Sequence, residues 1–197
     1  MAALTELREL AAKDLCGALA EAERENAAWK KCQALAWVAR YAPAGRVVGI
    51  SRAALAAARE ADDPYHSTFA SAWPLRALLE RDQAEAASDA LAPILLQSQG
   101  VTPMASRSEA LFLIFQAVVI GEAHAWASVF GLLMDASSPP RHWRQGRNIR
   151  DAVLIVASRD VGLAHRAMAQ LDDAKLRRKL EGKLASGVCS QPRAFFW

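Results

Sequence analysis

Apolar residues recur every three or four positions along almost the whole chain. The pattern is clearest within residues 28–42, 111–133 and 149–171. Such spacing gives a helix one apolar stripe and leaves its opposite face polar. No segment alternates apolar and polar residues as a half-buried strand does, and the many alanines favour helix. The sequence therefore predicts an all-α fold with helix well above half of the residues and essentially no sheet.

Three dipeptides indicate where helices begin. Each places a capping side chain before a proline, and they lie 39 and 36 residues apart: Asp63-Pro64, Thr102-Pro103 and Ser138-Pro139. A capping oxygen accepts hydrogen bonds from free backbone N–H groups, and a proline at the first helical position forfeits none. Pro74 and Pro93 fall within helical patterns and predict kinks or late helix starts.

Large apolar residues recur in nearly the same phase, at spacings of 36, 39 and 37 residues: Trp37, Trp73, Phe112 and Ile149. We expect each to be buried in the first helix of an antiparallel pair. The second helices are then expected to begin near Arg46, Asp82, Gly121 and Asp160. Four pairs with this period, one helix before them and one basic helix after them, predict a right-handed solenoid. Residues 1–185 would form a single helical-repeat domain, and residues 186–197 a tail with an aromatic end.

The segment 63–73, Asp-Pro-Tyr-His-Ser-Thr-Phe-Ala-Ser-Ala-Trp, resembles the opening of a HEAT repeat, and residues 86–91 resemble its second helix. The resemblance covers residues 27–171 and implies a HEAT-like helical-repeat fold. Tetratricopeptide repeats are similar in outline, but their period is about 34 residues. In addition, Pro74 stands where that family has a small residue. A compact, non-repeating helical bundle is the remaining alternative.

Charge is distributed unevenly along the chain. Residues 1–136 hold 12 basic and 16 acidic residues, whereas residues 137–197 hold 12 basic and 5 acidic residues. Such asymmetry indicates either an anionic partner at the C-terminal end or head-to-tail self-association. A second basic run, within residues 175–183, has the composition of a solvated terminal helix.

The most unusual segment spans residues 141–150 and contains four arginines and a tryptophan. The candidate partner- or anion-binding residues are Arg141, Trp143, Arg144, Arg147 and Arg150. Arginine forks bind carboxylates or phosphates, and tryptophan packs on a partner or stacks on a base. Alternatively, Trp143 is buried between helix pairs and the arginines face acids such as Glu109, Glu122 or Asp135.

No motif predicts catalysis, a cofactor or a metal site, because the four histidines lack metal-ligand spacing and no phosphate-binding loop or nucleophile elbow occurs. The three separated cysteines predict reduced thiols in a cytoplasmic protein, with Cys16 and Cys32 as small core residues. No signal peptide is recognisable, and the longest apolar run, residues 110–121, is shorter than the roughly 20 residues that span a bilayer. We therefore expect a soluble protein.

The leading functional hypothesis is a non-catalytic scaffold that binds a protein or peptide, since helical solenoids need no active site. The alternative is a nucleic-acid-binding protein, or an enzyme of the HEAT-like DNA glycosylase type, that uses the basic C-terminal third. Asp151 beside Arg150 is the nearest candidate for the acid that family needs. A third hypothesis, an enzyme with a helical pocket, has only His66, Trp73 and His124 to draw on.

The last residues are strongly aromatic. Phe195, Phe196 and Trp197 would be an aggregation hazard if they were free in water. We expect them to dock, either on their own chain or on a neighbouring subunit, and the second case would produce a homo-oligomer.

Overall fold

The chain is α-helical throughout the part that the structure describes. A computed structural model covers residues 2–196, with the side chains of residue 7 and of residues 9–196. Twelve α-helices hold 75% of the chain, and residues 2–196 contain no strand. The prediction of an all-α fold is confirmed.

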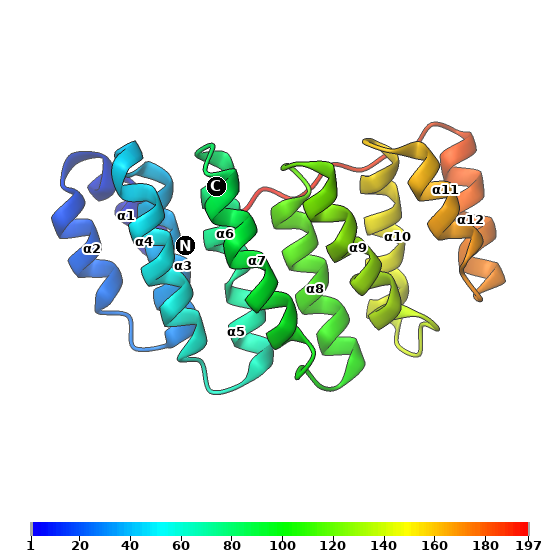
Figure 1. Cartoon of the computed structure of the whole chain (residues 1–197), viewed down its shortest axis with the longest axis horizontal. Helices are drawn as coiled ribbons and strands as arrows, with labels where there is room; N and C mark the ends of the chain where they lie inside the picture. The colour runs from blue at the N-terminus through cyan, green and yellow to red at the C-terminus, as the bar shows by residue number, and fades with distance from the viewer. Residues whose placement is uncertain (1, 197) are drawn as a thin grey trace. The chain divides into compact units, whose positions relative to one another are not determined.

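The helices belong to two compact units (Figure 1). Unit 1 consists of residues 1–100 and 194–197, and unit 2 consists of residues 101–193. The helices of unit 1 are α1 (Ala2–Lys13), α2 (Leu15–Glu23), α3 (Ala28–Tyr41), α4 (Ala44–Arg59), α5 (Pro64–Ala70), α6 (Ala72–Glu80) and α7 (Ala84–Ser98). Those of unit 2 are α8 (Met104–Val118), α9 (Ala123–Ser137), α10 (Trp143–Ala157), α11 (Val161–Ala169) and α12 (Ala174–Ala185). The single domain expected over residues 1–185 stays a prediction.

Antiparallel helix pairs form at the predicted spacing within each unit. Short turns join α3 to α4 and α6 to α7 in unit 1, and α8 to α9 and α10 to α11 in unit 2 (Figure 1). Each second helix begins within two residues of its predicted start. The N-terminal region differs, because two helices replace the single expected one. Asp14 separates them and caps α2 by accepting a hydrogen bond from the Gly17 N–H, 3.0 Å away.

One of the three predicted helix starts is confirmed. The Asp63 carboxylate accepts a hydrogen bond from the His66 N–H at 2.9 Å, and Pro64 is the first residue of α5. The other two differ to unequal extents. Thr102 does not cap α8, which begins one residue after Pro103, and Ser138 does not cap α10, which begins four residues after Pro139 and is capped by His142. Instead α8 begins at Met104, and α10 begins at Trp143.

Pro74 produces the late helix start that was predicted for it. It lies in the first turn of α6, directly after the break that separates α5 from α6. A proline has no N–H to donate to the carbonyl four residues earlier, which is that of Ala70. The buried thiol of Cys32 donates to this carbonyl instead, at 3.3 Å. Pro93 lies inside α7, as its position in a helical pattern indicated.

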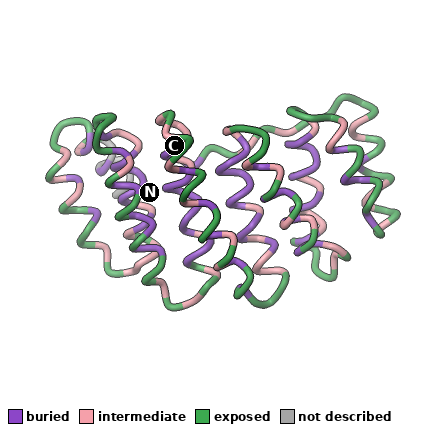
Figure 2. The backbone as a smooth tube through the Cα atoms, in the orientation of Figure 1, coloured by how far each residue is buried: buried purple, intermediate pink, exposed green. Residues whose placement is uncertain are grey.

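In the core, α4 and α7 each bury one face, whereas α3, α8 and α10 are buried on nearly all sides over part of their length (Figure 2). Trp37, Trp73 and Ile149 are buried as predicted. Phe112 is only half-buried, so the prediction is wrong for this residue. In α8, residues 110–118 are buried apart from Phe112, so the helix is covered on nearly all sides. Phe112 lies three residues after the half-buried Glu109 and shares its more open face.

The cysteines differ sharply in their surroundings. Cys32 is fully buried in α3, as predicted, and burial raises the pKa of its thiol. Cys16 is exposed, which contradicts the prediction that it is a core residue. The inward face of α2 is formed by Ala18 and Ala22, and Cys16 lies two positions from Ala18, on the opposite side of the helix.

We expect Ile149→Ala to lower the free energy of unfolding by about 2–5 kcal/mol, because Ile149 is fully buried and the substitution leaves a cavity. The control is Val161→Ala on α11, where the valine is 58% exposed and the loss should stay within about 0.5 kcal/mol. Urea denaturation measures both changes. Equal losses in the two variants would contradict the assigned core.

The thiols provide a second test. At mildly alkaline pH we expect a thiol reagent to modify Cys16 and Cys189 rapidly, since both are exposed. Cys32 should react only when the protein unfolds, because burial raises its pKa and disfavours the nucleophilic thiolate. Cys32→Ala should therefore leave the rapid phase unchanged. If all three thiols of the native protein reacted equally fast, the burial of Cys32 would be contradicted.

Candidate functional site

The loop before α10 is held in place by the side chain of Gln145. Its Oε1 atom accepts hydrogen bonds from the backbone N–H groups of Arg141 and His142, both at 3.0 Å. Its Nε2 atom donates to the carbonyl of Ala136 in α9, also at 3.0 Å. The His142 ring completes the cap, because its Nδ1 atom accepts from the Arg144 N–H at 3.2 Å. The first turn of α10 is therefore fixed against the end of α9.

A buried chain of polar side chains continues this support one turn further along α10. The Asn148 amide donates to the Ser108 hydroxyl at 3.0 Å, and the hydroxyls of Ser108 and Ser137 lie 2.7 Å apart. These contacts join α10 to α8 and α9. All three side chains are fully buried. Since a buried polar group is costly without a partner, these bonds favour one rotation of α10 about its axis.

That rotation places Trp143 on the outside of unit 2. Its side chain is 65% exposed, so the alternative in which it is buried between helix pairs is wrong. The guanidinium groups of Arg144 and Arg147 lie 5.7 and 5.2 Å from the centre of its ring. Both distances are within the range of a cation–π contact. The ring is thus held by two arginines while much of its surface faces solvent.

The same two arginines share a single carboxylate. Glu109 in α8 lies 3.1 Å from Arg144 and 3.9 Å from Arg147. Glu109 is one of the three acids expected to face this segment, and the contact is confirmed. Arg144 and Arg147 remain 46% and 39% exposed, and one carboxylate cannot neutralise two guanidinium groups. Exposed ion pairs of this kind contribute only about 0–1 kcal/mol each, so the surface keeps a positive charge that a partner can use.

Arg150 and Arg141 have different surroundings. Arg150 forms an ion pair with Asp151 at 2.6 Å, and the hydrogen bond to that carboxylate raises the pKa of Arg150. Asp151, the nearest candidate for a catalytic acid, is therefore held by its neighbouring arginine. Arg141 precedes the helix and lines a pocket. Of the five predicted residues, the structure brings together Trp143, Arg144 and Arg147.

The pocket beside this surface has a volume of about 430 Å³. It lies between the start of α8 and the loop before α10. Its lining includes Pro103, Met104, Pro139, Arg141 and His142. Met104 is 50% exposed and adds an apolar side chain to this lining. We call Trp143, Arg144, Arg147 and this pocket the Trp143 surface.

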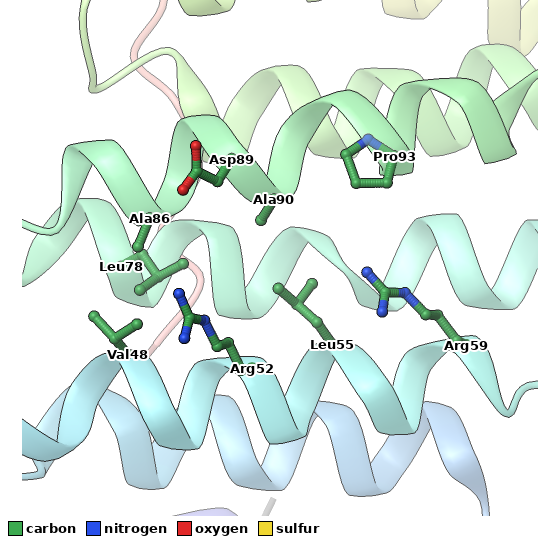
Figure 3. Close-up of a pocket in the computed structure, with 9 residues that line it drawn as sticks. All are labelled: Val48, Arg52, Leu55, Arg59, Leu78, Ala86, Asp89, Ala90 and Pro93. Atoms are coloured by element: carbon green, nitrogen blue, oxygen red, sulfur yellow. The ribbon is translucent and has the colours of Figure 1, made fainter.

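A groove in unit 1 was not predicted from the sequence. It has a volume of about 330 Å³ and is lined by α4, α6 and α7. Figure 3 shows Arg52 and Arg59 extending from α4 towards α7, which carries Asp89. Neither arginine has an ion-pair partner among the described side chains. Their seven-residue spacing, two helical turns, could have indicated that they share one face.

Residues 2–196 contain neither a cluster of metal-binding side chains nor a helix that could span a membrane. No group of three or more histidine, cysteine, aspartate or glutamate side chains is placed to hold a metal ion in this range. Within the same residues, each helix falls short of the length and apolar character that crossing a bilayer requires.

The basic side chains of α12 form no ion pair with any described residue and lie mostly exposed. They are therefore a useful source of control substitutions.

We expect Gln145→Ala to lower the free energy of unfolding by about 1–3 kcal/mol, because it leaves two backbone N–H groups and the Ala136 carbonyl without their partner. Gln191→Ala is the matched control, since Gln191 is exposed in the tail and should change stability little. Chemical denaturation measures both. An unchanged stability for Gln145→Ala would mean that this side chain does not hold the loop.

Comparison with known proteins assigns no family to this geometry. No family model matches the sequence, and no curated protein or solved structure shows significant similarity to it. The case for a function therefore rests on the surfaces that have just been described.

Proposed function

We propose that this chain is a non-catalytic protein-interaction module, built as a HEAT-like solenoid of helix pairs. The proposal is carried by one observation: Trp143 is largely exposed between two arginines, on a helix whose rotation is fixed by buried hydrogen bonds. Tryptophan and arginine are the residue types most enriched among those that dominate binding energy at protein interfaces. The near-constant spacing of the helix pairs favours the solenoid, which presents side chains on a long rigid surface.

The chemistry of the Trp143 surface favours an acidic partner segment that also carries apolar side chains. Arg144 and Arg147 together have one carboxylate, Glu109, so a second carboxylate from the partner would be attracted. Apolar side chains of the same segment would cover Trp143 and enter the pocket beside Met104. Covering the surface also removes water from around the arginines, which strengthens their attraction to carboxylates.

The alternative is nucleic acid. Arginines bind phosphates as well as carboxylates, and an exposed tryptophan can stack on a base. This alternative makes a distinct claim about salt, because each phosphate contact releases condensed counterions and steepens the salt dependence of binding. The glycosylase variant of this alternative would further require Asp151 to leave Arg150, to which it is bound. We therefore favour the protein partner.

The test uses a fluorescent peptide in which glutamate and leucine alternate, and fluorescence anisotropy at low and moderate salt. We expect the wild-type chain to bind it. Arg144→Ala/Arg147→Ala and Trp143→Ala should each weaken binding at least tenfold, equivalent to about 1.4 kcal/mol. Arg178→Ala/Lys179→Ala on α12 removes the same charge from unit 2 at exposed positions and should weaken binding much less.

Three other outcomes would count against the proposal. Tighter binding to duplex or single-stranded DNA, with a steep salt slope that flattens in Arg144→Ala/Arg147→Ala, would favour nucleic acid. Equal losses in the two double variants would mean that only net charge matters. No binding of either probe, together with a loss of thermal stability in Arg144→Ala/Arg147→Ala, would assign these arginines to the fold.

A further inference from the structure

The end of the chain packs into unit 1, on a face formed by α3 and α6. Phe195 and Phe196 are only 1% and 7% exposed. Phe196 meets Trp37 of α3 edge-on, with ring centres 5.3 Å apart, and Phe195 meets Trp73 of α6 in the same way at 5.4 Å. The expectation that these two aromatic residues dock is confirmed. Trp197, the third residue of that expectation, lies outside the described residues.

Two arginines complete the enclosure of the phenylalanine rings. Arg40 lies 5.0 Å from the centre of the Phe196 ring, and Arg76 lies 5.6 Å from that of Phe195. Glu80 holds both guanidinium groups, at 2.5 Å from Arg40 Nε and 2.6 Å from Arg76 Nε. The carboxylate thereby fixes the arginines where their positive charge faces the aromatic rings. Each phenylalanine is thus bound by one tryptophan and one arginine.

This arrangement has the organisation of a receptor and a ligand. The receptor side comes entirely from α3 and α6, within residues 28–80, and it repeats the same tryptophan–arginine pair twice: Trp37 with Arg40, and Trp73 with Arg76. In both pairs the arginine follows the tryptophan by three residues, so the two share a helix face. The ligand side is two adjacent phenylalanines in a segment without helix or strand.

Within residues 186–196, Phe195 and Phe196 are the two buried side chains. Earlier in the segment, inside unit 2, the Ser190 N–H donates to the Leu154 carbonyl at 3.1 Å and the Arg193 N–H donates to Gln116 Oε1 at 2.9 Å. A docked segment with its apolar contacts concentrated in two side chains resembles a bound extended peptide, whose affinity depends on a few anchors.

We propose that the α3–α6 face is a binding site for two adjacent aromatic residues of an extended peptide. In the monomer the chain's own Phe195 and Phe196 occupy it, and the same residues of a second copy take their place when the internal tail is released. Covalent attachment makes docking of the internal tail an intramolecular event, which favours it over a free peptide at low concentration. The internal tail therefore excludes a free competitor, and occupancy by a second copy requires that it be weakened first.

The test uses the full-length chain and a labelled peptide with the sequence of residues 190–197. We expect little binding to the wild type and at least tenfold tighter binding to Phe195→Ala/Phe196→Ala, in which the internal competitor lacks its anchors. A peptide with both phenylalanines replaced by alanine should not bind. Adding Arg40→Ala/Arg76→Ala to the receptor side should weaken binding of the unmodified peptide several-fold.

Phe196→Leu provides a second variant that keeps most of the buried apolar volume but loses the aromatic contacts with Trp37 and Arg40. Its affinity for the peptide should lie between those of the wild type and the double variant. Equal affinity of the peptide for all three chains would overturn the proposal. So would absence of binding to both variants while circular dichroism shows them folded.

Discussion

The structure depends on the burial of apolar helix faces against neighbouring helices. An apolar residue at every third or fourth position supplies that face, and the small side chains of alanine let helices approach closely. Where only one side of a helix is buried, as in α4 and the first turns of α10, the other side is free to vary without loss of the core. The exposed features of both units lie on such free faces: Trp143 with Arg144 and Arg147 in unit 2, and Arg52 with Arg59 in unit 1.

Two buried polar residues depart from this rule and give α10 its particular orientation. Gln145 and Asn148 lie one turn apart and replace apolar packing with hydrogen bonds to the loop, to α8 and to α9. Apolar contacts alone would permit small rotations, whereas hydrogen bonds with defined partners do not. Because these hydrogen bonds direct Gln145 and Asn148 inwards, Trp143 on the same helix faces outwards. The position of the candidate interaction surface thus depends on the hydrogen bonds that Gln145 and Asn148 make on the inner face of α10.

Much of the fold was predictable from the sequence, because helical periodicity depends only on neighbouring positions. The starts of the second helices were predicted to within two residues, in phase with the recurrence of Trp37, Trp73, Phe112 and Ile149. The start of α8 was predicted to within one residue, whereas α10 begins four residues after Pro139, at a cap formed by His142. The arginine cluster of residues 141–150 could be recognised in the sequence. The role of Gln145 could not be predicted, because the carbonyl to which it donates belongs to another helix. The groove lined by Arg52 and Arg59 was not predicted either.

The most direct measurement of the central claim is hydrogen–deuterium exchange of the full-length chain with and without the glutamate–leucine peptide. Binding at the Trp143 surface should slow backbone exchange in the loop and first turns of α10, residues 138–150, and in the first turn of α8, with little change elsewhere. Slowed exchange centred on α12 or on the groove of unit 1, with residues 138–150 unchanged, would contradict the claim that Trp143 and its arginines form the interaction surface.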